Sequence, residues 1–149
     1  MTPLATAPLF HLAFPVTDLN KARSFYGDIL GCGTGRESER WIDFDFFGHQ
    51  LVAHLVAPED HPSTNTNQVD GHAIPASHFG VILQWQQLDE LAQRLKGKGI
   101  KFVIEPYVRF EGRRGEQMTL FVCDPSSNYL EFKAFRHIDA LFAKDLDQY

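Results

Sequence analysis

The sequence has few cysteines, little positive charge and no long apolar run. It contains only two cysteines in 149 residues, Cys32 and Cys123, with no CxxC spacing and no cluster of histidines around them. This excludes a disulfide scaffold and a structural zinc site, so we expect both thiols to be reduced and to lie in the core.

The charge balance and the hydropathy pattern exclude two further classes of protein. The 14 Lys and Arg residues are outnumbered by 19 Asp and Glu residues, which gives a formal net charge of -5. A polyanion such as DNA would be repelled on average, so we expect no nucleic-acid partner. No segment approaches the roughly 20 apolar residues of a membrane span, and residues 1–9 lack the basic start of a signal peptide. We therefore expect a cytoplasmic protein with no membrane partner.

The sequence does contain an ordinary globular composition arranged as two similar halves. Hydrophobic residues make up 44% of the chain and aromatic residues 13%, which is enough to bury a core. Each half begins with a short apolar run, continues with a helical stripe and ends with strands. We predict an α+β fold of two tandem modules, at about 9–56 and 77–135, with a helical tail at 137–149.

The residue pattern of the first module predicts a strand, a helix and a hairpin. Residues 9–16 are long enough for a strand but too short for a helix, and Thr17–Asp18 offers an N-cap. The helical stripe ends at Gly31, and its apolar residues are Leu19, Ala22, Phe25, Tyr26, Ile29 and Leu30. Alternation over residues 40–56, interrupted by Gly48–His49, predicts an antiparallel hairpin.

The second module repeats this order after a polar segment. Residues 57–77 show no periodicity and predict a loop between the modules. The elements expected next are a strand at 77–85, a helix with the stripe Leu88, Leu91, Ala92 and Leu95, and strands at 100–104, 118–123 and 129–135. A charged connection at 107–117 and a turn at 124–128 separate the last three strands.

Three residues at related positions of the two halves could carry chemistry. His11 and His78 each lie in the first strand of a module, and Glu131 is the one acidic residue in the run Tyr129–Phe132. A carboxylate buried without a partner is costly, so Glu131 should have one. If the three side chains converge, they form an open site for a divalent metal, as in non-haem Fe(II) oxygenases. The plain alternatives are histidines bonded to the backbone and a glutamate paired with an arginine.

These residues also carry a resemblance to a known family. The segments concerned are Phe10–Leu19, Ala22–Tyr26, Ile29–Cys32, His78–Val81 and Asp124–Phe132. Together they resemble the vicinal oxygen chelate superfamily, which includes glyoxalase I, extradiol ring-cleaving dioxygenases and the bleomycin and fosfomycin resistance proteins. The resemblance covers nearly the whole chain. It implies paired βαβββ modules whose mixed or antiparallel sheets form a half-open barrel around a divalent metal.

The resemblance also implies a set of metal ligands. Carried over to this sequence, they are His11, His78 and Glu131, with Fe(II) as the first choice of metal and Mn(II), Zn(II) or Ni(II) as alternatives. Glyoxalase-like members have a fourth ligand, usually Glu, on the last strand of the first module. Counting from the turn places Val52 at that position, and alignment of the apolar flanks places His54 there. Neither is a carboxylate, which favours a three-ligand site.

For an extradiol dioxygenase, the resemblance implies three metal ligands and a separate histidine that acts as acid and base. His54 is the candidate for the acid–base role, because imidazole titrates near neutral pH. The alternatives for His54 are a fourth ligand or a packed histidine bonded to the backbone. A tyrosine that donates to the substrate is also implied upstream of the glutamate, but Phe121 stands there. Tyr129 or Tyr107 could replace it.

Four further residues are candidates for binding the substrate. Arg109 and Arg113 could hold an anionic group, although such a charged run is more often a solvated hairpin tip. Phe46 and Gln50 could line the pocket, although aromatic strand positions are also common in a core.

The leading functional hypothesis is therefore a metal-dependent oxygenase of the extradiol type that acts on a catechol-like substrate. The second hypothesis is a glyoxalase-like isomerase or lyase, or a thiol transferase of the resistance kind. The third is a metal-free protein that binds a small molecule. By resemblance alone, a homodimer is expected.

Overall fold

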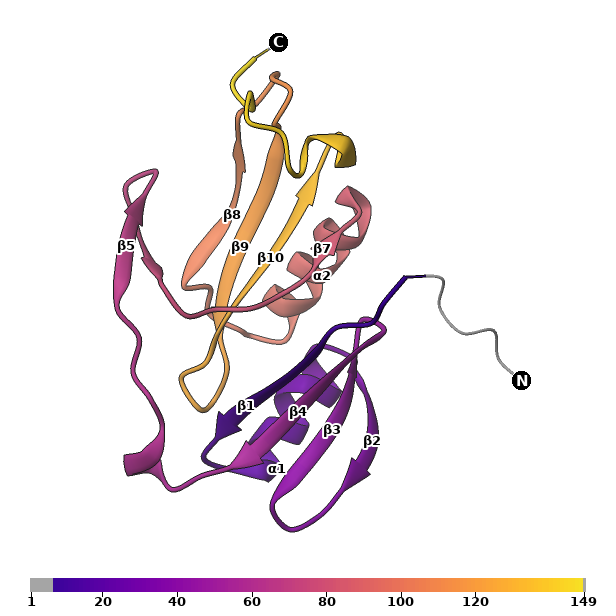
Figure 1. Ribbon diagram of the computed structural model, residues 1–149, viewed down its shortest axis with the longest axis vertical. Coiled ribbons are helices and arrows are strands. Elements are labelled where there is room, and N and C mark those ends of the chain that lie inside the picture. Colours follow the sequence, from indigo (N-terminus) through magenta and orange to yellow (C-terminus); the bar gives the residue numbers. More distant parts are fainter. Residues whose placement is uncertain (1–6, 149) are drawn as a thin grey trace, which may run out of the picture. The chain divides into compact units, whose positions relative to one another are not determined.

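The computed structural model describes residues 7–148. The chain divides after Pro62 into two compact units, unit 1 and unit 2. Each unit contains a mixed four-stranded sheet with a helix on one face (Figure 1). The α+β class is thus confirmed, and the two sheets are of the kind that βαβββ modules form.

Unit 1 is built from four strands and one helix. Its elements are β1 (His11–Val16), α1 (Leu19–Ala22) continuing as the π-helical η1 (Arg23–Ile29), β2 (Gly33–Glu37), β3 (Trp41–Phe46), β4 (His49–Leu55) and the short η2 (Pro58–Asp60). The sheet order is β1-β4-β3-β2, with β1 parallel to β4 and the other pairs antiparallel. As expected, Asp18 caps the helix by accepting from the Lys21 N–H at 2.9 Å, and the chain leaves the helix at Gly31 with a φ of 80°.

The two faces of the unit 1 sheet differ in chemistry. One face packs on the helix and forms the core with Phe14, Ile42, Phe44, Phe46, Leu51, Ala53, Ala22, Phe25 and Tyr26. The opposite face carries His11, Gln50 and His54 together with the two aspartates of β3. This second face, which we call the polar face of unit 1, holds the predicted site residues of the first module except Phe46.

Unit 2 has the same plan and an additional hairpin. Its elements are β5 (Thr66–Val69), β6 (His72–Pro75), β7 (Ile82–Leu83), α2 (Trp85–Gly97), β8 (Ile104–Arg109), β9 (Gln117–Cys123), β10 (Tyr129–Phe135) and η3 (Ile138–Ala140). The sheet order is β7-β10-β9-β8, and β5 and β6 form a separate two-stranded sheet. Helix α2 packs against β10 with the buried residues Leu88, Leu91 and Leu95. The opposite face of the sheet, the polar face of unit 2, carries Glu131, Thr119 and Tyr107.

Several expected elements differ from the observed ones. The predicted loop 57–77 contains the β5–β6 hairpin, and the strand expected at 77–85 is reduced to β7 because Trp85 begins α2. The strand expected at 100–104 starts only at Ile104 and continues to Arg109, so the first residues of the expected connection 107–117 belong to β8. Strand β2, which was not expected, has only exposed residues.

The C-terminal tail is not the amphipathic helix that its spacing predicts. Among tail residues 137–148, only Ile138–Ala140 form a helical turn, and Phe142 is 91% exposed. Further along, the tail is bonded to the connection between β8 and β9: the Gly115 N–H donates to the Leu146 carbonyl at 2.8 Å. These contacts with the connection replace helical hydrogen bonds there.

Two other expectations concern the cysteines and the membrane. Cys32 and Cys123 are free thiols, but both are half-buried rather than in the core, and burial raises the pKa of Cys123. Within residues 7–148 no helix has the length and hydropathy to cross a bilayer.

Candidate functional site

The polar face of unit 2 brings two of the predicted ligands into contact. Nε2 of His78 lies 3.0 Å from Oε2 of Glu131, and the side chains are 27% and 14% exposed. His78 lies shortly before β7, and Glu131 lies on the adjacent strand β10. The Phe121 ring packs edge-on against the imidazole with a centroid distance of 5.1 Å. The structure therefore gives Glu131 the partner that its burial requires.

The neighbours of the two His78 ring nitrogens determine where its hydrogens are. Nδ1 lies 2.6 Å from the carbonyl oxygen of Pro75, and a carbonyl oxygen only accepts, so Nδ1 carries a hydrogen. Nε2 then faces Glu131 with either a second hydrogen or a lone pair. Two lone pairs at 3.0 Å repel, so a proton or a metal cation is needed between these atoms.

The electrostatics of this pair agree with that geometry. The hydrogen bond to Glu131 raises the pKa of His78, although partial burial opposes the shift. Burial alone would raise the pKa of Glu131, but His78, Lys133 and Thr119 together lower it. The Thr119 hydroxyl donates to Oε1 of Glu131 at 2.8 Å, and Lys133 Nζ lies 3.7 Å from the same oxygen. Glu131 is therefore an ionised carboxylate held in place by neighbouring side chains.

The polar face of unit 1 holds the third predicted ligand. Nδ1 of His11 lies 2.8 Å from Oε1 of Gln50, the residue opposite it on the parallel strand β4. With that oxygen as the acceptor, Nδ1 carries the hydrogen and Nε2 carries the lone pair. His11 and His78 thus share one arrangement, in which an oxygen fixes Nδ1 and Nε2 is the nitrogen suited to a metal.

The strand register identifies the residue of unit 1 that corresponds to Glu131. His11 is level with Gln50, and the Phe79–Leu130 bridge puts His78 level with Tyr129. Two residues further along each last strand, Val52 corresponds to Glu131. The alternative alignment, which placed His54 there, is wrong. On its last strand, unit 1 therefore has a valine where unit 2 has its carboxylate.

His54 lies on the same face as Gln50, four residues further along β4. At about 3.3 Å per residue it is about 7 Å beyond Val52 along the strand. The His54 ring lies 6.5 Å from the ring of Trp41, its partner on β3. His54 therefore lies beyond the level on β4 that corresponds to Glu131.

The two candidate tyrosines have different surroundings. Tyr129 is half-buried on the same face of β10 as Glu131, at the level that corresponds to Gln50 in unit 1. The hydroxyl of Tyr107 instead donates to Oδ2 of Asp70 at 3.1 Å, and burial is the main cause that raises the pKa of Tyr107. Tyr107 is therefore engaged by the β5–β6 hairpin, which leaves Tyr129 as the candidate donor to a substrate.

Three of the expected substrate-binding residues have other partners in the structure. Arg109 lies on β8, not in a loop, and its Nε is paired with Oδ2 of Asp70. Arg113 donates from Nη1 to the carbonyl oxygen of Asp147 at 2.9 Å, so it holds the C-terminal tail. Phe46 is 4% exposed and lies on the core face of β3, opposite to the polar face. Of the four residues, only Gln50 lies beside a predicted ligand.

The donor atoms fit a divalent cation. Two imidazoles present Nε2, and one ionised carboxylate lies beside one of them; this is the donor chemistry of two-histidine, one-carboxylate sites. Across residues 7–148, the structure gathers no three His, Cys, Asp or Glu side chains into a metal-binding group. His78 and Glu131 meet within unit 2, whereas His11 belongs to unit 1. The complete three-ligand site therefore stays a prediction.

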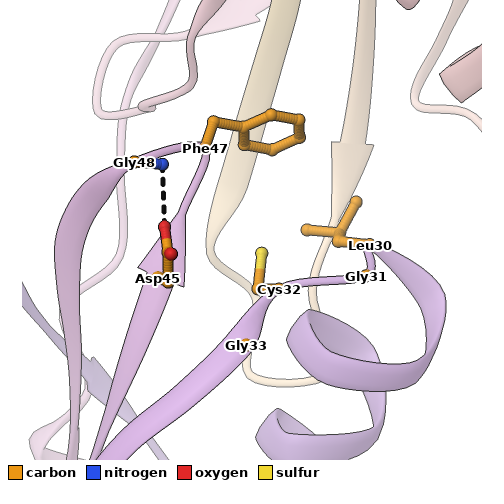
Figure 2. A pocket seen from close by; sticks show the side chains of 7 residues that line it. All are labelled: Leu30, Gly31, Cys32, Gly33, Asp45, Phe47 and Gly48. Carbon is orange, nitrogen blue, oxygen red and sulfur yellow. Dashed lines mark hydrogen bonds between the residues drawn. The ribbon is translucent and has the colours of Figure 1, made fainter. Parts of the chain in front are cut away.

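Unit 1 also contains an open hollow of about 310 Å³ that the sequence did not predict (Figure 2). Its lining residues are Leu30, Gly31, Cys32, Gly33, Asp45, Phe47 and Gly48. The Cys32 thiol points into the hollow, and Asp45 accepts from the Gly48 N–H at 2.8 Å. No predicted site residue lines this hollow, so it is not the expected substrate pocket.

The fold and the residues on its polar faces define a protein of paired βαβββ type. A family model described as the glyoxalase/bleomycin resistance protein/dioxygenase superfamily matches residues 9–132. The chain therefore belongs to this superfamily, whose members are mostly metal-dependent enzymes.

Solved structures agree with this assignment. A glyoxalase/bleomycin resistance protein/dioxygenase from Alicyclobacillus acidocaldarius is 35% identical over 94% of this chain and 100% of its own, with a TM-score of 0.75. A fosfomycin resistance protein from Listeria monocytogenes is 19% identical, with 87% and 94% of the two chains covered and a TM-score of 0.64. A lactoylglutathione lyase from Agrobacterium tumefaciens is 15% identical, with 89% and 96% covered and a TM-score of 0.59. The last two show likeness of fold alone.

Proposed function

We propose that the protein is a metal-dependent oxygenase of the extradiol ring-cleaving type that acts on a small catechol-like substrate. The observation that supports this best is the register, which places Val52 at the level of Glu131. Without a carboxylate at that level, His11, His78 and Glu131 form a three-ligand set that leaves coordination positions open for a substrate and dioxygen.

Besides the three ligands, His54, Tyr129 and Gln50 on the two polar faces have roles in this proposal. When bound, a divalent cation, with Fe(II) as the first choice, supplies positive charge that lowers the pKa of a substrate hydroxyl. His54 accepts the proton of that hydroxyl and returns it later. Tyr129 and Gln50 form hydrogen bonds with the substrate oxygens and orient the ring. We also propose that the protein is a homodimer, which light scattering can test.

Oxygen consumption tests the reaction class. Protein loaded anaerobically with Fe(II) is expected to consume one O₂ for each catechol and to give a coloured, ring-opened product, followed by an oxygen electrode and absorbance. Hemithioacetals and thiols with electrophilic substrates serve as the comparison panel. Conversion of that panel without oxygen uptake would support the isomerase or thiol-transferase hypothesis and contradict ours. Binding of a small molecule with no turnover at all would favour the metal-free hypothesis.

His54→Asn tests the proposed acid–base residue. Loss of a general acid–base group typically lowers kcat by about 10²–10⁴-fold, and we expect a loss in this range. Metal content should stay unchanged, because His54 lies beyond the ligand level on β4. The control is His137→Asn, which changes an exposed histidine in the tail. A variant that lost its metal as well would show His54 to be a ligand.

A further inference from the structure

The β5–β6 hairpin is a part of unit 2 to which the proposed reaction gives no role. It is a separate two-stranded sheet beside β8 (Figure 1). Its turn residues Asp70 and Gly71 have φ angles of 51° and 79°, the pair of positive angles found in a type I′ turn. A two-stranded hairpin is marginally stable by itself, so its contacts with the rest of unit 2 must hold it in place.

The tip of the hairpin is fastened to β8 by one carboxylate. Oδ2 of Asp70 accepts from the Tyr107 hydroxyl at 3.1 Å and is paired with Nε of Arg109. The His72 ring packs on the Tyr107 ring at a centroid distance of 5.0 Å. The Arg109 side chain is 24% exposed and the Asp70 side chain 43%, so water screens this ion pair in part. We call these interactions the tip contact.

The base of the hairpin lies directly before His78. The Ala76 N–H donates to the Asn65 carbonyl at 2.6 Å, and the Ser77 N–H donates to Oγ1 of Thr64 at 2.8 Å. Pro75 ends β6 and is buried, and its carbonyl is the acceptor for Nδ1 of His78. The hairpin therefore supplies the atom that determines which ring nitrogen of His78 carries a hydrogen.

That carbonyl matters because Glu131 favours the opposite tautomer. A neutral imidazole beside a carboxylate gains most by placing its single hydrogen on Nε2 and donating it to Glu131. A metal cannot bind that nitrogen until the hydrogen leaves. The Pro75 carbonyl favours the hydrogen on Nδ1, which leaves the Nε2 lone pair directed at the position beside Glu131.

We infer that the β5–β6 hairpin positions His78 for metal binding, with Asp70 as the positioning residue that holds the hairpin on β8. The inference rests on the proposed function only in taking His78 as a metal ligand. In this inference Asp70 is neither a metal ligand nor a substrate contact. It acts through the hairpin and the Pro75 carbonyl, which together hold the imidazole in one tautomer and one orientation.

Asp70→Gly removes the tip contact and leaves the turn intact, because Gly-Gly suits a type I′ turn. Two properties are measured. The first is the exchange with water of the His78 Nδ1 proton in metal-free protein, by NMR, with the signal assigned by its loss in His78→Gln. The second is the Kd for Zn(II), by competition with a chelator. We expect faster exchange of this proton than in the wild type. We also expect a Kd about 10-fold higher, the lower end of the 10–100-fold range for loss of an outer partner of a metal ligand.

Two further variants complete the test. Asp70→Asn retains an acceptor oxygen for Tyr107. Its Nδ1 proton exchange and its Kd for Zn(II) should therefore lie between those of the wild type and of Asp70→Gly. Asp89→Asn makes the same charge change on the exposed side of α2 and should change neither property. The amide signals of β9 and β10 should match those of the wild type in every variant, which separates positioning from a general loss of structure.

The outcomes separate this inference from the proposed function. Suppose that Asp70→Gly speeds the exchange of the hairpin amide protons but leaves the exchange of the Nδ1 proton and the Kd for Zn(II) unchanged. The inference is then overturned. It is also overturned if the Nδ1 proton of the wild type exchanges as fast as that of a free imidazole. A wild-type protein with a protected Nδ1 proton that Asp70→Gly exposes, but with no affinity for Zn(II), would contradict the proposed function and leave the positioning of His78 supported.

Discussion

Glu131→Gln is expected to weaken the binding of divalent metal by about 100-fold or more while unit 2 remains folded. Loss of an outer hydrogen-bond partner already costs a metal site about 10–100-fold, and this substitution removes an anionic ligand itself. The fold should persist, because the amide oxygen of the introduced glutamine can still accept from Thr119, whose hydroxyl donates to Oε1 of Glu131 in the wild type.

The measurement is the metal content of protein prepared anaerobically, together with a Kd from competition with a chelator. Glu105→Gln is the matched control, since it removes one charge from an exposed position of β8 in the same sheet. Equal metal content in Glu131→Gln and the wild type would remove Glu131 from the ligand set and the three-ligand hypothesis with it. Loss of metal from the control as well would point to a general effect of charge.

The elements that the sequence predicted best are those with one buried face and one polar face. Strand β10 was expected at 129–135 and is observed there, because apolar residues facing α2 alternate with residues of the polar face. The hairpin of β3 and β4 and the helix α2 were found for the same reason. In these segments the hydrophobic period reflects packing against one layer.

The missed elements have no such period. Strand β2 is exposed throughout, so nothing in its composition indicates a buried face. The hairpin at 66–75 is polar, and its one local signal was the Asp70–Gly71 pair, which favours a type I′ turn. Without alternating apolar residues on either side, that signal alone does not predict a hairpin. The tail has helical spacing, but a segment of that length is marginal as a helix without a packing surface.

The site could be predicted as a set of residue types but not as a set of contacts. The positions of His11, His78 and Glu131 in the two halves indicated a shared role. The surroundings of His78 depend on hydrogen bonds to Pro75 and to Glu131 that no local pattern encodes. Thr119 was missed for a similar reason: it stands in an apolar run, and only the pairing of β9 with β10 brings its hydroxyl to the carboxylate.

Gly80→Ala is expected to be strongly destabilising, because Gly80 lies against the backbone of β10. A Cβ at this position would overlap the carbonyl group of Glu131. The chain on either side is fixed to β10: the Glu131 N–H donates to the Phe79 carbonyl at 2.9 Å, and the Lys133 N–H donates to the Val81 carbonyl at 3.4 Å. The added methyl group must therefore separate two bonded strands.

We expect the free energy of unfolding to fall by about 3 kcal/mol, the upper end of the usual cost of overpacking. For a chain of this size that corresponds to a melting temperature lower by roughly 6–12 °C. Thermal unfolding followed by circular dichroism measures the change. Because the clash lies two residues from His78 and at Glu131 itself, the separation of these side chains should also increase and metal affinity should fall.

Gly97→Ala is the control that separates crowding from the general effect of adding a methyl group. Gly97 ends α2, no atom outside its chain neighbours and the nearby backbone of its own helix lies within 4 Å of a Cβ built there, and its φ is not positive. Alanine should leave stability unchanged or raise it by up to about 1 kcal/mol, since it favours helix more than glycine does. A Gly80→Ala protein with the wild-type melting temperature but without metal affinity would mean that residues 79–81 move away from β10 locally. If it matched the wild type in both properties, the close approach of the two backbones, and the placement of His78 that depends on it, would be wrong.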